Sequence, residues 1–307
     1  MAPIDEVLKI NDDKLAWSLE TADQASPDDM FELYIQHRES GDETEAGKWL
    51  QRAAELGHCQ ALTVLGTCID GDERLAHELK AAELGCDQAQ YTLGLWYLHY
   101  LDTDYLPKDY VQAAFWLTKA AEQGNMDAQL KLGLMYLEGQ GVPPDDDVAV
   151  AWIRKSANQN HEWAYSQLGT MYLEGRGVPQ SDKEAAACFL KAAELGDFDA
   201  PFQMGMMYLE GRGVPQDDEQ ACYWIRVSAE NGFRGAQALL GEMLALGQVT
   251  PRNLVEAAVW LAKAADMGDE EAQILLDQLR RSGVLDQDTL VTLDLLDRDP
   301  VCRRILH

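Results

Sequence analysis

Three glycine-rich segments have the composition of loops that hold phosphate groups, and each of them reads Gly-x-Gly-Val-Pro. They span residues 139–143, 175–179 and 211–215. A P-loop follows a strand and ends in Lys-Ser or Lys-Thr, and these segments have neither feature. Because the three copies recur in the same phase of a longer period, we interpret them as turns between helices.

The histidines are the next candidates for chemistry, because imidazole binds metal ions and transfers protons near neutral pH. None belongs to an HExxH motif, has a recurring carboxylate partner or combines with cysteines in a metal-binding spacing. The six are His37, His58, His77, His99, His161 and His307. No nucleophile elbow, kinase motif or dinucleotide fingerprint occurs either. We therefore predict no catalytic residue, no metal site and no cofactor, and we do not expect an enzyme.

Two acidic runs, residues 145–147 and 217–219, follow two of the glycine-rich turns. They lack the alternating oxygen ligands and the closing glutamate of a calcium loop. We expect them to stabilise the positive N-terminal ends of the helices that they begin.

The six cysteines fall at irregular intervals and form no CxxC pair. Cys59 and Cys68 lie on opposite sides of one predicted helix, so they cannot bridge each other. We therefore expect reduced thiols, as in a reducing compartment.

The 307-residue chain is strongly acidic, with 53 acidic and 25 basic side chains and a formal net charge of −28. Its hydrophobic content of 47% suits a folded protein. A polyanion repels the phosphates of nucleic acids and of anionic lipids, so we predict neither nucleic-acid nor membrane binding. Asp5 and Glu6 stand where a signal peptide has basic residues, and no apolar run reaches the length of a membrane span. We therefore expect a cytoplasmic location.

Two kinds of phrase alternate along the chain, and each recurs every 36 residues. The first kind, such as AQLKLGLMYLEG, keeps Gly133, Gly169, Gly205 and Gly241 in one phase. Upstream copies surround Gly66 and Gly94, where the spacings become 28 and 39 residues. Apolar side chains within each phrase share one arc at helical spacing, so the phrase predicts an amphipathic helix with a buried arc.

The second kind of phrase, such as AAFWLTKAAEQG, places a large side chain in one slot and a pair of small residues shortly after it. The slot holds Trp49, Trp116, Trp152, Trp224 and Trp260, with His77 and Cys188 in the other two copies. We expect the tryptophans, and His77 in their place, to fill the gap between helices. The small pair lets neighbouring helix axes approach, and a preceding cation such as Lys119 suits the carbonyl end of a helix.

A helix written A-Q-x-x-L-G-x-M-Y-x-x-G, a loop G-x-G-V-P and a helix written A-x-x-W-x-x-K-A-A-E-x-G resemble the Sel-one-like repeat, a relative of the tetratricopeptide repeat. The resemblance covers about residues 41–281 and is strongest over 109–268. It implies an all-α fold: antiparallel helix pairs of about 36 residues, stacked into a right-handed α-α superhelix, or solenoid, that serves as an adaptor in protein complexes. The copy near Gly66 lacks eight residues, and Leu244 replaces a recurring tyrosine.

We expect three parts: an N-terminal helical cap at residues 1–40, a solenoid of about seven repeats at 41–284 with the second one shortened, and a C-terminal capping helix at 285–307. Open apolar ends of a solenoid need such caps. Ser26-Pro27-Asp28 is a typical helix start.

A stripe on each first helix varies between copies and points away from the buried arc, at motif positions 3, 7 and 11 counted from the first alanine. By the architecture that the resemblance implies, it lines the concave surface. The stripe comprises Tyr91, Leu95 and His99; Leu130, Leu134 and Glu138; Ser166, Thr170 and Glu174; Phe202, Met206 and Glu210; and Ala238, Glu242 and Leu246. Its apolar members either form a groove for a partner segment, with the glutamates selecting cations, or pack against the adjacent repeat.

These features lead to two hypotheses. The first is a cytoplasmic, bacterial, non-enzymatic adaptor that holds another protein on its concave face. The second is an immunity protein or secretion chaperone that neutralises a single basic partner such as a toxin, because the negative field accelerates encounter with a basic protein. The sequence leaves open the partner's identity, the oligomeric state and the face that is used.

Overall fold

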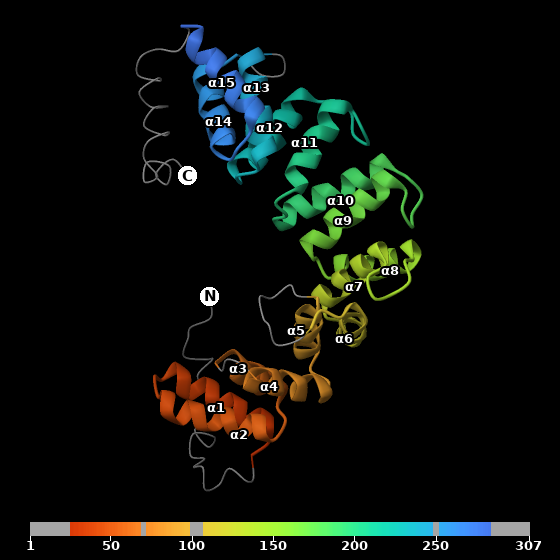
Figure 1. The fold of residues 1–307 in the computed structure, drawn as a ribbon, viewed down its shortest axis with the longest axis vertical. Coiled ribbons are helices and arrows are strands. Elements are labelled where there is room, and N and C mark those ends of the chain that lie inside the picture. The colour runs from red at the N-terminus through yellow and green to blue at the C-terminus, as the bar shows by residue number, and fades with distance from the viewer. Residues whose placement is uncertain (1–24, 69–71, 99–106, 248–251, 284–307) are drawn as a thin grey trace, which may run out of the picture. The chain divides into compact units, whose positions relative to one another are not determined.

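The computed structural model describes residues 25–68, 72–98, 107–247 and 252–283. Most of the expected N-terminal cap and the whole expected C-terminal capping helix at 285–307 lie outside the described residues. The chain divides into two compact units, residues 1–144 and 145–307. Within each unit, every helix packs against the next one along the chain (Figure 1).

Unit 1 (residues 1–144) contains seven helices in its described part. They are α1 (Pro27–Glu39), α2 (Glu43–Glu55), α3 (Cys59–Cys68), α4 (Asp72–Glu83), α5 (Asp87–Tyr97), α6 (Tyr110–Glu122) and α7 (Met126–Glu138). Because α1 packs against α2, the expected boundary at residue 40 separates two helices that are in contact.

Unit 2 (residues 145–307) contains eight helices in its described part. They are α8 (Asp146–Ala157), α9 (Glu162–Glu174), α10 (Asp182–Leu195), α11 (Ala200–Glu210), α12 (Asp218–Glu230), α13 (Arg234–Leu246), α14 (Leu254–Asp266) and α15 (Glu270–Arg281). No strand occurs among the described residues of either unit. The predicted fold class is confirmed: the chain is an all-α helical-repeat solenoid of antiparallel helix pairs.

Side-chain caps fix where the helices begin. The Ser26 hydroxyl accepts a hydrogen bond from the Asp29 amide at 3.1 Å, so the predicted helix start there is confirmed. Asp145 and Asp217 likewise cap α8 and α12, which confirms that the two acidic runs stabilise helix starts. Glycines with positive φ end most helices, and Asn160, at φ 64°, stands in a slot that is glycine in most other repeats.

The glycine of four first-helix phrases, at positions 94, 169, 205 and 241, lies against a large apolar side chain of the paired second helix. A Cβ atom added to Gly205 would lie 2.5 Å from the Ile225 side chain, and one added to Gly94 would lie 2.6 Å from Leu117. A buried glutamine strengthens the pairing with the preceding helix: the Gln129 side chain donates to the Ala121 carbonyl at 3.0 Å. The recurring A-Q-x-x-L-G pattern is therefore a packing pattern.

Replacing Gly205 by alanine should lower the free energy of unfolding by about 1–3 kcal/mol, because the added methyl overlaps Ile225. Urea denaturation followed by circular dichroism measures the change. The matched control is Gly47→Ala in α2, where an added Cβ would meet no atom within 4 Å; it should stabilise the protein by about 0.5–1 kcal/mol. Equal effects of the two substitutions would contradict the packing role of Gly205.

Candidate functional site

The first-helix face, which we define as the residues at motif positions 3, 7 and 11, is a mixture of apolar and acidic side chains. Tyr91 and Leu95 of α5, Leu134 of α7, and Phe202 and Met206 of α11 are half-buried. Leu130 is only 1% exposed, and Ser166 is also buried. Leu130 therefore belongs to the packing between helices and offers no surface to a partner.

Acidic side chains lie at the last position of three successive first helices. Glu138, Glu174 and Glu210 are exposed, as are Glu242 and Leu246 of α13. Thr170 and Ala238 are half-buried. His99 lies outside the described residues. In each unit, the face thus combines half-buried apolar groups with solvated carboxylates.

Two aromatic residues of this face interact with groups of their own unit. The Phe202 ring lies 4.9 Å from the ring of Phe233, which precedes α13. Burial, with a smaller contribution from Asp127, raises the pKa of Tyr91 to about 12. The Tyr91 hydroxyl therefore stays neutral near pH 7, as a hydrogen-bond donor and acceptor.

The glycine-rich segments are helix-to-helix turns, as predicted from their phase. A Cβ atom added to Gly213 would lie 2.0 Å from the Asp182 carbonyl oxygen of the preceding second helix. The Arg212 guanidinium contacts the Asp182 carboxylate at 3.0 Å and Glu210 at 3.5 Å. Arg176 pairs in the same way with Asp146 at 2.8 Å. These segments fasten one repeat to the previous one.

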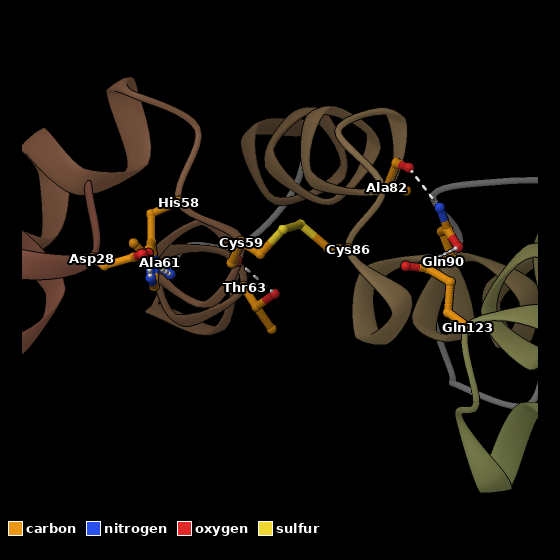
Figure 2. Close-up of a disulfide and its surroundings, with 9 residues drawn as sticks. All are labelled: Asp28, His58, Cys59, Ala61, Thr63, Ala82, Cys86, Gln90 and Gln123. Atoms are coloured by element: carbon orange, nitrogen blue, oxygen red, sulfur yellow. Dashed lines mark hydrogen bonds and ion pairs between the residues drawn. A yellow bond between two sulfur atoms is a disulfide. The ribbon is translucent and has the colours of Figure 1, made fainter. Parts of the chain in front are cut away.

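His58 has a structural role at the start of α3. Its Nδ1 accepts a hydrogen bond from the Ala61 amide at 3.1 Å, and its Nε2 lies 3.2 Å from the Asp28 carboxylate (Figure 2). The Phe31 ring stacks on the imidazole at 4.5 Å. Burial lowers the pKa of His58, although Asp28 opposes this. Among the described residues, no group of three or more His, Cys, Asp or Glu side chains could hold a metal ion.

Cys59 and Cys86 form a disulfide, so the expectation of reduced thiols is wrong for this pair. The S–S distance is 2.09 Å and the Cα atoms lie 5.4 Å apart (Figure 2). Cys59 begins α3 and Cys86 immediately precedes α5, so the bond encloses the α3–α4 hairpin. Cys59 does not pair with Cys68 on its own helix; the bond joins the N-terminal ends of the first helices of two adjacent repeats. Cys188 and Cys222 are free thiols.

The hairpin enclosed by the disulfide contains a buried carboxyl group that the sequence argument missed. Glu78 is 1% exposed, its Oε2 has no hydrogen-bond partner among the described residues, and a Cβ atom added to Gly66 would lie 3.3 Å from Oε1. Burial raises the pKa of Glu78 to about 7, against the opposing effect of Arg74. In the other six copies the same slot is apolar: Leu50, Leu117, Ile153, Phe189, Ile225 and Leu261. A charged residue in a slot that is otherwise apolar was the sequence signal that could have predicted this buried carboxyl group.

A family model described as the Sel1 repeat matches residues 38–58, 87–125, 127–161, 164–197, 199–233 and 235–269. The unmatched stretch 59–86 is the disulfide-enclosed hairpin. No described helix is both long and apolar enough to cross a membrane.

Two solved structures share the fold. One is c5321, a protective antigen present in uropathogenic Escherichia coli strains that displays an SLR fold, with 30% identity, a TM-score of 0.77, and coverage of 92% of this chain and 64% of that one. The other is a Sel1 repeat protein from Oxalobacter formigenes, with 33% identity, a TM-score of 0.70, and coverage of 84% and 78%.

A curated relative matches over a shorter stretch. Chitin synthase regulatory factor 3 of Schizosaccharomyces pombe is 31% identical over 118 residues, which are 38% of this chain. The match spans 12% of that relative's length.

Replacing Glu78 by leucine should remove a pH-dependent loss of stability. Between pH 4.5 and about 7 the unfolded chain releases the Glu78 proton while the native state keeps it, so stability falls as the pH rises. We expect roughly 2–3 kcal/mol of the difference in unfolding free energy between pH 5 and pH 8 to disappear. Urea denaturation at both pH values measures this. Exposed Glu83→Gln is the control, and an unchanged difference in the leucine variant would contradict the assignment.

Reducing the Cys59–Cys86 bond should destabilise unit 1 by about 3–4 kcal/mol, because it closes a loop of 27 residues in the unfolded chain. Thermal unfolding with and without a phosphine reductant measures the effect. The Cys59→Ser/Cys86→Ser double variant should have the unfolding temperature of the reduced protein, and the reductant should not change it. The Cys188→Ser variant should behave as wild type.

Proposed function

Because the chain belongs to the Sel1 repeat family, whose members generally mediate protein–protein interactions, we propose that it is a non-enzymatic scaffold that binds a partner protein on its first-helix face. The observation that carries the proposal is the composition of that face. Half-buried Phe202 and Met206 lie on the same helix as exposed Glu210, and Leu134 and Glu138 repeat this arrangement in unit 1. Apolar groups supply contact area, and the carboxylates select cations.

The partner is a basic protein or has a basic segment. The formal net charge of −28 gives the whole chain a negative field, which speeds association with a basic protein and repels nucleic acids and anionic membranes. The same charge supports a second candidate function: an immunity protein or secretion chaperone that neutralises one basic partner, such as a toxin. A dedicated inhibitor holds one partner in a salt-sensitive complex, whereas a general scaffold retains several.

The cytoplasmic location expected from the sequence stays a prediction, and the disulfide counts against it. Cytosolic reductants keep thiols reduced, and structural disulfides persist in oxidising compartments such as the bacterial periplasm. The partner is therefore to be sought in an oxidising compartment as well as in the cytosol.

The test is affinity capture from native lysate with low-salt and then high-salt washes, comparing wild type with two charge-matched variants. Glu174→Lys/Glu210→Lys alters the first-helix face, while Glu83→Lys/Glu122→Lys makes the same change in net charge at exposed positions near the ends of second helices. We expect the first variant to lose at least about tenfold in retained partner, because two attractive charges become repulsive. The second should bind nearly as wild type.

An apolar variant, Phe202→Asp/Leu134→Asp, tests the other component of the face, with Val255→Asp on α14 as a control that is 48% exposed. Circular dichroism must first show that each variant is folded. Equal retention by all folded variants would rule out the first-helix face as the binding site.

A further inference from the structure

The slot that tryptophan occupies in five repeats packs against the paired first helix. Trp116 and Leu93 share one core cluster, and so do Trp260 and Leu240. In each pair the leucine is residue 5 of the first-helix phrase. The indole ring and this leucine therefore belong to one buried core.

In the disulfide-enclosed repeat, imidazole replaces indole and a hollow remains. Its volume is about 440 Å³, within the range of small-ligand sites. It is lined by Gln51, Ala54, Glu55, Leu65, His77 and Lys80. His77 is half-buried and its Nδ1 atom is inaccessible to water, so it is packed as expected, but the imidazole is smaller than an indole and leaves space beside it.

Leu65 gives the hollow an apolar floor. Leu65 is residue 5 of its phrase and is only partly buried. The equivalent residues in the later repeats are all buried: Leu93, Leu132, Leu168, Met204 and Leu240 are between 0% and 5% exposed. The hollow therefore has an apolar floor that other repeats cover with their own packing.

A cation is already in position beside this floor. In three repeats the lysine three residues after the tryptophan lies over the indole ring: Lys119 over Trp116 at 4.9 Å, Lys155 over Trp152 at 3.7 Å, and Lys263 over Trp260 at 4.5 Å. Lys80 has the same register relative to His77 and lines the hollow. It can make the same cation–π contact with a ring that comes from outside.

We propose that this hollow binds the tryptophan side chain of a partner protein, with the indole on Leu65 and under Lys80. Glu55, whose side chain is 51% exposed at the rim and pairs with Arg52 at 3.2 Å, adds a carboxylate that favours a basic residue next to that tryptophan. This site lies on α2, α3 and α4 and shares no residue with the first-helix face. This proposal rests on the proposed function in one respect: the ligand of the hollow is part of another protein.

The experiment titrates the full-length oxidised protein with the tripeptide acetyl-Lys-Trp-Lys-amide and follows the Leu65 methyl signals by NMR. We expect saturable shifts at millimolar peptide. Acetyl-Lys-Leu-Lys-amide tests for the aromatic ring and acetyl-Glu-Trp-Glu-amide for the charge, and both should bind at least threefold more weakly. Equal binding of the leucine peptide, or no shift with the tryptophan peptide, overturns the proposal.

Three variants locate the site. His77→Trp restores the indole of the other repeats, so it should raise Tm by about 2–4 °C and abolish peptide binding. Lys80→Ala should weaken binding about threefold through the lost cation–π contact, whereas Lys119→Ala, which lies over the protein's own Trp116, should not change it. If His77→Trp folds poorly, the comparison between Lys80→Ala and Lys119→Ala shows whether the peptide binds in the hollow. Equal binding by these two lysine variants would overturn the proposal.

Two further outcomes concern the occupant and the link to the scaffold function. Peptide binding that appears only after Trp17→Ala would identify the chain's own tryptophan as the occupant and overturn the proposal. The first-helix variant Glu174→Lys/Glu210→Lys should bind the tripeptide as wild type does. The scaffold proposal and the hollow can therefore fail separately.

Discussion

The close contact between a first-helix glycine and a large apolar side chain of the second helix is the constraint on which each repeat depends. A residue larger than glycine at positions 94, 169, 205 or 241 would overlap Leu117, Phe189, Ile225 or Leu261. Because the helices approach so closely, the small pair and the buried glutamine can form their own contacts. The turns that follow are positioned by the same approach, and their arginines reach the aspartates of the preceding repeat.

The second repeat departs from this constraint in several ways at once. It has a carboxyl group where the others have an apolar side chain, imidazole where most have indole, and eight residues fewer than the 36-residue unit. The first two changes place polar groups at positions where most other repeats have apolar side chains. The Cys59–Cys86 bond encloses this one repeat, so a covalent constraint is present in the repeat that has these polar substitutions. The polar substitutions and the disulfide therefore occur in the same repeat, which also contains the open apolar hollow.

The period of the sequence was enough to predict the fold. Glycines and tryptophans in phase define the helix pairs, and the capping residues define where helices begin. The first-helix face was predicted only in part, because a helical wheel gives the direction of a side chain but not the depth to which its neighbours cover it. Leu130 and Leu134 look alike in sequence, yet Leu130 is fully buried and Leu134 is half-buried. The disulfide could not be predicted from helical spacing, because Cys59 and Cys86 lie on different elements and are brought together only by the stacking of adjacent repeats.

The disulfide also determines how the chain responds to mechanical tension. When the two ends are pulled apart, force passes directly from residue 59 to residue 86 through the sulfur atoms, and the hairpin between them carries no load. Reduction adds this hidden length, roughly 90 Å of extended chain, to the path that bears force. An oxidised molecule tethered at both ends therefore has a shorter maximum extension than a reduced one, with the difference confined to a single repeat.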